Sequence, residues 1–252
     1  MDGTSQDGFR EIVNRLAAAQ KTNRGAPAYS RWVNRWLGRR IAAAAFLRGA
    51  TPNQVTAVSA ALTYTGIALI AFVAPSIALS LIICVLLLAG YAFDSADGQL
   101  ARLRGGGRPS GEWLDHVVDM AKMTLLHGAV LFSWLRFGIP GQDPNDWLLG
   151  LPILFTAASV TGFFGWLLSD LLVRISRGDR PKTVPAGEKA PWLRSILRAP
   201  TDYGILALSF ALFAGTWFLP IYALLLAANL AVTLLALPVW FRQVDAVGRP
   251  VQ

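Results

Sequence analysis

The stretches DSADGQLAR (residues 94–102) and GEWLDHVVD (residues 111–119) decide how this chain folds and where its chemistry lies. Together they bring four aspartates, Asp94, Asp97, Asp115 and Asp119, to the junction of two long apolar segments. A carboxylate at the edge of hydrocarbon is costly, so by default it marks a functional site. We therefore expect this junction to be the functional centre of the protein.

The spacing of the four aspartates predicts that they face one another. Asp94 and Asp97 are separated by three positions and Asp115 and Asp119 by four, so each pair projects from one face of a helix. A turn through residues 105–107, all glycine, would make the two helices antiparallel. Four such anions repel one another unless a hard cation such as Mg²⁺ binds among their oxygen atoms. The alternative, a set of helix caps, would need one acid at this place and not four.

Composition indicates a polytopic α-helical membrane protein. Of the 252 residues, 54% are hydrophobic and only 15% are charged, and the mean hydropathy is +0.45, which is unlike a soluble domain. The formal charge of +8 would suggest nucleic acid in a soluble protein. In a membrane protein it indicates basic loops beside anionic lipid headgroups, so we expect no nucleic-acid partner. The single cysteine, Cys84, excludes a disulfide within the chain.

Apolar runs divide the chain into four parts. We expect a polar cytosolic tail over 1–28, with an amphipathic stretch at 9–18, and an amphipathic juxtamembrane helix over 29–50. A transmembrane domain of about six helices follows over 51–242, and a cytosolic tail over 243–252. The expected spans are 51–72, 77–94, 111–137, 147–172, 200–220 and 221–241.

The distribution of basic residues predicts the orientation of these spans. Lys122 lies within a span and Arg136 on one side of the membrane, whereas the tails and loops that carry the other Lys and Arg residues share the opposite side. Because basic loops stay in the cytoplasm, we expect a multi-pass protein of the plasma membrane with both termini and the acidic junction cytoplasmic.

The acidic pattern resembles the signature of a known enzyme family. D-x2-D-G-x2-A-R-x8-G-x3-D-x3-D is similar to the signature of the CDP-alcohol phosphotransferases, integral membrane enzymes of phospholipid synthesis. Every signature position is filled, by Asp94, Asp97, Gly98, Ala101, Arg102, Gly111, Asp115 and Asp119.

The resemblance implies a reaction and a set of roles. A CDP-linked alcohol, most often CDP-diacylglycerol in bacterial members, would be attacked by an acceptor hydroxyl, and CMP would leave. It also implies a homodimer, a Mg²⁺ or Mn²⁺ cofactor, and Asp119 as the general base. The metal ligands would be Asp94, Asp97, Asp115 and Asp119, and the residues on the nucleotide side would be Gly98, Ala101 and Arg102.

Residues around the signature suggest further contacts. Thr56, one turn into the first span, is a candidate contact of the nucleotide. Lys122 follows Asp119 by three positions and would bind an anionic acceptor or pair with Asp119, against the alternative of a snorkelling or structural cation. Arg198 is our candidate for an acceptor phosphate, because the loop after the fourth span is basic.

The two histidines are expected to be structural. His116 adjoins Asp115 but is rotated away from the acidic face, which favours a hydrogen-bonding role over metal ligation. His127, two turns beyond the site, is expected to be a hydrogen-bonded core residue.

Other functions and acceptors stay open on the sequence. A transporter could use the same acids, although its ionisable groups would more often lie near the bilayer midplane, and a scaffold could use them as caps. The segment at 101–107 is similar to bacterial phosphatidylinositol-phosphate synthases, although 173–179 lacks their Arg-rich pattern. The segment at 114–116 is similar to choline and ethanolamine phosphotransferases, which carry the head group on CDP. Glycerol phosphate, inositol and serine are further acceptors; the basic loop favours a polyol phosphate.

Overall fold

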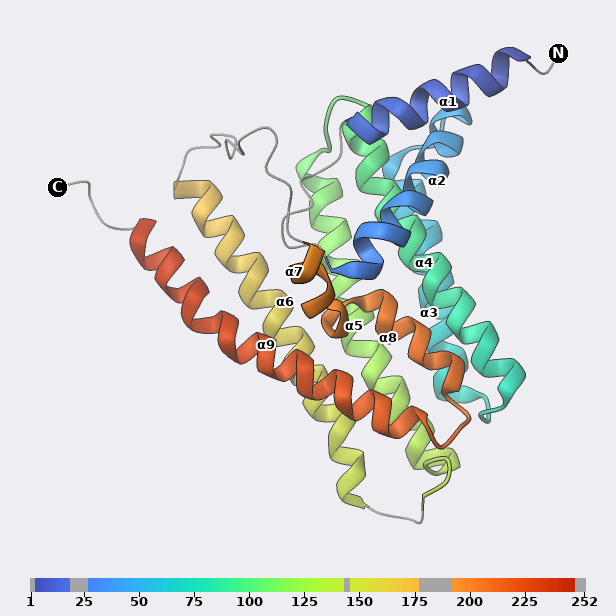
Figure 1. Cartoon of the computed structure of the whole chain (residues 1–252), viewed down its shortest axis with the longest axis vertical. Coiled ribbons are helices and arrows are strands. Elements are labelled where there is room, and N and C mark those ends of the chain that lie inside the picture. Colours follow the sequence, from blue (N-terminus) through green and yellow to red (C-terminus); the bar gives the residue numbers. More distant parts are fainter. Residues whose placement is uncertain (1–2, 19–26, 143–145, 177–191, 248–252) are drawn as a thin grey trace.

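The protein is a bundle of long helices against which several shorter helices pack (Figure 1). The computed structural model describes residues 3–18, 27–142, 146–176 and 192–247, and no strand occurs among them. The elements are α1 (Gly3–Ala18), η1 (Ser30–Asn34), α2 (Arg35–Leu47), α3 (Pro52–Phe72), α4 (Ile77–Leu103), α5 (Pro109–Phe137), η2 (Asp146–Leu149), α6 (Gly150–Ser176), α7 (Trp192–Leu197), η3 (Ala199–Thr201), α8 (Tyr203–Ser209), η4 (Phe210–Leu212) and α9 (Phe218–Val247).

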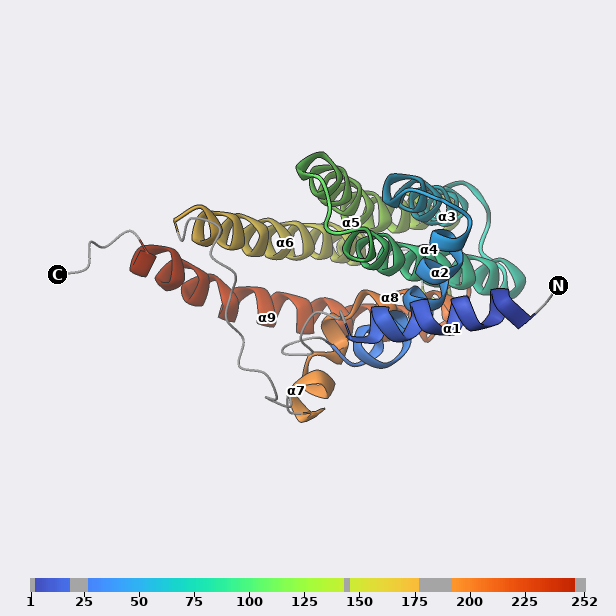
Figure 2. The ribbon, with the colours of Figure 1, turned by 90° about the horizontal axis from the view of Figure 1, so that it is seen from above.

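The helices are arranged so that α3 packs against both α4 and α5, and α6 packs against α5 and α9. Viewed from above, α9 runs beside α6, while α8 lies against α4 (Figure 2). The helices α1 and α2 lie at the end of the bundle where α4 ends and α5 begins (Figure 1). This arrangement places the C-terminal part of α4, which carries the first acidic stretch, against α2.

The long apolar helices confirm the prediction of a multi-pass, all-α membrane protein. Among the described residues, four helical segments are long and apolar enough to cross a bilayer: Pro52–Phe72, Ile77–Leu103, Trp147–Ser176 and Phe218–Val247. Helix α5 has 29 residues, but its first half carries the charged residues of the acidic junction. The expected count of six continuous spans is therefore not confirmed.

The segment expected as the fifth span, 200–220, is broken into shorter pieces. Its apolar helical part covers only Tyr203–Leu212, which at about 1.5 Å per residue is roughly half of a hydrocarbon core of about 30 Å. The chain then turns at a buried cluster that contains Phe213 and Phe218, and the Ala214 N–H donates to Ser80 Oγ of α4 at 3.0 Å. Aromatic packing thus ends this helix before α9 begins.

Helix starts follow the capping residues in the sequence. Thr51 caps α3, because Thr51 Oγ1 accepts the Gln54 N–H at 3.3 Å while Gln54 Oε1 accepts the Thr51 N–H at 2.8 Å. This reciprocal pair is a capping box, and Pro52 at the first helical position is compatible with it. Ser76 caps α4 by accepting the Leu79 N–H at 3.2 Å. These bonds fix the residues at which α3 and α4 begin, and therefore the level along the helices at which Thr56 faces α4.

The N-terminal residues form more regular structure than a polar tail suggests. The amphipathic stretch expected at 9–18 belongs to α1, which begins at Gly3, and its Ile12 and Leu16 are buried in a cluster with Ala42 and Ala43 of α2. The juxtamembrane segment is helical as η1 and α2 and leaves Trp32 and Trp36 about half exposed. Its placement at a membrane interface stays a prediction.

The core between α5, α6 and α9 contains a hydrogen-bonded histidine, as expected. His127 Nδ1 lies 2.7 Å from Tyr222 Oη, and its Nε2 lies 3.4 Å from Ser159 Oγ. The imidazole stacks on Phe155 with 4.0 Å between ring centroids. We name His127, Tyr222, Ser159 and Phe155 the histidine node. It joins three helices through neutral contacts away from the acidic junction.

Candidate active site

The acidic faces of α4 and α5 meet through Lys122. Its Nζ donates to Asp119 Oδ1 on α5 at 2.6 Å and to Asp94 Oδ1 on α4 at 3.3 Å. Lys122 is only 3% exposed, whereas the side chains of Asp94 and Asp119 are 18% and 21% exposed, so the ammonium is buried and its acids are partly open to solvent. The predicted meeting of the two acidic faces is therefore seen in the structure, with an ammonium group between them. Lys122 occurs here as the ion-pair partner of the acids, and a contact with an acceptor stays a prediction.

Asp97 is held by neutral donors. Thr56 Oγ1 on α3 donates to Asp97 Oδ2 at 2.5 Å, and the Gly98 N–H is directed at Asp97 Oδ1 at 2.5 Å. Both Thr56 and Asp97 are buried. Helix α3 therefore forms a third wall of the site, and the Thr56 hydroxyl contacts the Asp97 carboxylate and, at 3.2 Å, the Pro52 carbonyl of its own helix. Its predicted contact with a nucleotide is not tested by the structure.

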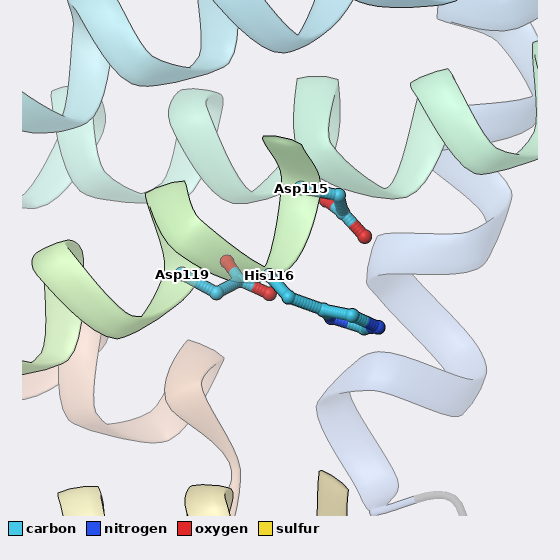
Figure 3. Close-up of side chains that lie close together, drawn as sticks. All are labelled: Asp115, His116 and Asp119. Carbon is cyan, nitrogen blue, oxygen red and sulfur yellow. The ribbon is translucent and has the colours of Figure 1, made fainter. Parts of the chain in front are cut away.

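Asp115, His116 and Asp119 form a group that could hold a metal ion (Figure 3). One ligand atom from each lies within 4.8 Å of the others, and all three side chains are partly exposed. Two carboxylate oxygens and an imidazole nitrogen are compatible with a divalent cation. The donor set therefore fits the cofactor that the acidic pattern implies.

His116 lies closer to the acids than its helical position suggested. Its imidazole also packs edge-on against Phe163 and Trp166 of α6, and its Nε2 lies 3.8 Å from Glu112 Oε1. The helical position of His116 gives only the direction of its Cα–Cβ bond. Rotation about the side-chain bonds can bring a ring nitrogen back toward Asp115. The ring contacts with α6 agree with a structural role, but the expected hydrogen bond is not seen: Nδ1 of His116 is buried without a partner among the described residues.

The residues expected on the nucleotide side gather at the end of α4. Arg102 lies beside Gly98, where an added Cβ would have Arg102 Nη1 as its nearest neighbour at 3.6 Å. The carbonyl of Ala101 accepts the Gly106 N–H at 3.0 Å, and Gly106 adopts a positive φ of 118°, which closes the helix. The surface of α4 beside Arg102 is therefore free of bulky side chains at Gly98.

The juxtamembrane helix adds a cation that the sequence reasoning missed. Arg35 is close enough to Arg102 for their charges to interact, and its carbonyl accepts the Gln99 Nε2–H at 3.4 Å. Burial lowers the pKa of the Arg35 guanidinium from its ordinary value. The helical periodicity of residues 29–50 assigns Arg35 to one face of a helix. It does not show that this face covers α4.

The basic residues after α6 are only partly described. Arg174 donates from Nη2 to Glu112 Oε1 of α5 at 2.7 Å, and its Nε lies 3.1 Å from Asp170 Oδ2. Arg198 is exposed at the start of η3. Of the other basic residues that follow α6, Arg177, Arg180, Lys182 and Lys189 lie outside the described residues, and the side chain of Arg194 is not described either. An acceptor site around Arg198 therefore stays a prediction.

Comparison with known proteins agrees with the acidic signature. The profile of the CDP-alcohol phosphatidyltransferase family matches residues 50–240, which is more than half of the chain and contains α3 to α6 and most of α9. A phosphatidylinositol phosphate synthase of Corynebacterium glutamicum is 40% identical over 89 residues. That match spans 34% of this chain and 37% of the relative.

The family match and the structure lead to one assignment. Enzymes of this family are transferases of substituted phosphate groups and generally depend on a divalent metal. The long apolar helices agree with a multi-pass membrane enzyme, and Lys122 joins Asp94 of α4 to Asp119 of α5. The chain therefore belongs to the CDP-alcohol phosphatidyltransferase family.

Proposed function

We propose that this protein transfers a phosphatidyl group from CDP-diacylglycerol to a hydroxyl of a polyol phosphate, such as inositol phosphate or glycerol phosphate, and releases CMP. The donor follows from the family assignment. The relative from Corynebacterium glutamicum, named a phosphatidylinositol phosphate synthase, supports an acceptor of this class. The basic residues that follow α6 provide charge for binding the phosphate of such an acceptor.

One observation carries the proposal: Lys122 contacts both Asp94 and Asp119. A side chain that reaches acids on two helices requires the two halves of the signature to surround one volume. Transfer between a nucleotide-linked donor and an acceptor requires such convergence, whereas helix caps do not. The convergence supports an enzyme rather than a scaffold.

A divalent cation, Mg²⁺ or Mn²⁺, would be held by the signature aspartates Asp94, Asp97, Asp115 and Asp119. When bound, it supplies neutralisation of the charge on the pyrophosphate of the donor. The oxygen-rich donor set fits either ion.

The side chains of this site would divide the work of the transfer. Asp119 accepts the proton of the acceptor hydroxyl as that oxygen forms its bond to the phosphatidyl phosphorus. The bond between this phosphorus and the oxygen of CMP breaks, and CMP carries away the electron pair. Arg102 contributes positive charge beside the nucleotide phosphates, and Thr56 keeps Asp97 oriented through its 2.5 Å hydrogen bond. Lys122 and Arg198 are the proposed contacts of the acceptor.

We also propose on which side of the membrane the site lies and that the protein is a dimer. The excess of basic residues in the tails and loops supports a site on the cytoplasmic side of the plasma membrane. The family supports a homodimer. In this arrangement, the soluble acceptor reaches the site from the cytoplasm and the acyl chains of the donor stay in the bilayer.

The test is CMP release by the full-length protein in detergent, with CDP-diacylglycerol and Mg²⁺. Inositol phosphate, glycerol phosphate, inositol and serine are offered one at a time, and the lipid product is identified by mass spectrometry. We expect CMP and one phosphorylated phospholipid with a polyol phosphate, and neither with Asp119→Asn. Release with CDP-choline or CDP-ethanolamine and diacylglycerol instead would reverse the assignment of donor and acceptor.

A further inference from the structure

Three of the signature acids, Asp94, Asp97 and Asp119, have partners of different charge. Thr56 and the Gly98 N–H, both neutral donors, contact Asp97. A full positive charge, the Lys122 ammonium, contacts Asp94 and Asp119. Lys122 therefore makes its ion pairs with one acid from each half of the signature.

The surroundings of Lys122 hold its ammonium at this place. The residue is 3% exposed, and its Nζ lies 5.3 Å from the centre of the Tyr203 ring of α8. A cation over an aromatic face is attracted by the ring, and burial removes water as a competing partner. Because Asp119 precedes Lys122 by one helical turn, their contact also needs no rearrangement of α5.

We propose that Lys122 is the internal counter-ion of the acidic site: it holds Asp94 and Asp119 together in the metal-free protein and competes with a divalent cation for their carboxylates. This inference rests on the metal site of the proposed function and assigns Lys122 a positioning role. It differs from a contact with the acceptor, because its effect is present with no substrate bound.

The competition has a defined direction. The Lys122 ammonium pairs with one oxygen of Asp94 and one of Asp119, two of the acids that would hold the divalent cation. Removing the ammonium leaves the acids more negative and frees two of them for the metal. The metal-free protein then loses a buried ion pair, so its stability should depend more strongly on the added cation.

The experiment measures Mn²⁺ binding to the full-length protein in detergent, without substrate, from the electron paramagnetic resonance signal of free Mn²⁺. We expect Lys122→Met and Lys122→Gln to bind Mn²⁺ roughly tenfold more tightly than the unmodified protein. Both should melt at a lower temperature without metal and recover more on addition of Mn²⁺. Lys122→Gln keeps a hydrogen-bond donor, so it separates loss of charge from loss of a hydrogen bond and decides the question if Lys122→Met does not fold.

The matched controls are Lys122→Arg, which keeps the charge and should bind Mn²⁺ like the unmodified protein, and Arg136→Gln at the other end of α5, which should also leave binding unchanged. Equal or weaker Mn²⁺ affinity in both neutral variants would overturn the counter-ion role while leaving the proposed function intact. Absence of Mn²⁺ binding in the unmodified protein, or binding that Asp97→Asn does not weaken, would overturn the metal site itself and the counter-ion role with it.

Discussion

The acidic site and the histidine node are two polar clusters that share helix α5, but the site is charged and partly exposed, whereas His127 in the node is buried among neutral partners. In the node, His127 has a hydrogen-bond partner at each ring nitrogen and an aromatic ring against its face. In the site, Lys122 is the cation paired with Asp94 and Asp119, and Asp115 and Asp119 crowd beside His116. A cluster of neutral groups that are hydrogen-bonded to one another stabilises packing. A cluster of several carboxylates is a candidate site for a ligand.

Removal of divalent metal is expected to have the largest effect on activity. It should act on the acidic site and leave the histidine node unchanged. We expect a chelator to reduce CMP release to the background, because the pyrophosphate of the donor would lose its counter-charge. Adding back Mg²⁺ or Mn²⁺ should restore the activity, and the helix content measured by circular dichroism should stay unchanged throughout. Activity that persists after exhaustive chelation would mean that the acids act without a metal.

The second-largest effect is expected from Asp119→Asn. This substitution removes the proposed general base while keeping the size of the side chain, so kcat should fall roughly 10²–10⁴-fold. Turnover under saturating substrate is the measurement, and Asp245→Asn near the end of α9 is the matched control, for which no change is expected. An Asp119→Asn enzyme with more than half of the original kcat would exclude Asp119 as the base.

A smaller effect on activity is expected from Thr56→Val. Valine has nearly the same shape but cannot donate to Asp97, and a hydrogen bond to a charged group is worth about 1.5–3 kcal/mol, so kcat/KM should fall about tenfold or more. Thr56→Ser should recover most of the activity. Thr124→Val is the control, because the exposed Thr124 hydroxyl donates only to the Met120 carbonyl of its own helix. Equal activity of Thr56→Val and Thr124→Val would show that Asp97 does not need this donor.

The smallest effect is expected at the histidine node, and on stability alone. Tyr222→Phe removes the partner of His127 Nδ1 and should destabilise the protein by about 1 kcal/mol, with kcat per folded molecule unchanged. Thermal unfolding in detergent measures this, and Ser159→Ala, whose contact is longer at 3.4 Å, should cost less. A loss of kcat in Tyr222→Phe at full stability would contradict the division between node and site.

The meeting of the two acidic faces could be predicted from the sequence, because it depends on the spacing of residues that are close together along the chain. The spacing of Asp94 and Asp97, and of Asp115 and Asp119, specifies helical faces, and the glycines between them predict the reversal that makes these faces meet. Capping is similarly local, because Thr51 caps α3 through Gln54, only three positions further along the chain. The family followed from the same pattern and is confirmed by the match over residues 50–240.

Contacts between distant segments could not be predicted in this way. The partners of Asp97 and Asp94 lie on α3 and α5, 41 and 28 positions away along the chain. Likewise, the hydropathy of the sequence predicts a fifth span that continues to residue 220, because Phe213 and Phe218 are apolar. Hydropathy does not show that these two side chains pack against each other where the chain turns.

The amino-acid sequence by itself determined the class of the molecule, the family and the acids at its centre, because membrane length, helical period and signature spacing depend on neighbours along the chain. Only the tertiary structure decided which groups contact Asp94, Asp97 and Asp119, that α2 packs on α4 beside Gln99, and where the fifth apolar segment stops. These depend on the distances between helices, which side-chain packing sets and no local pattern records.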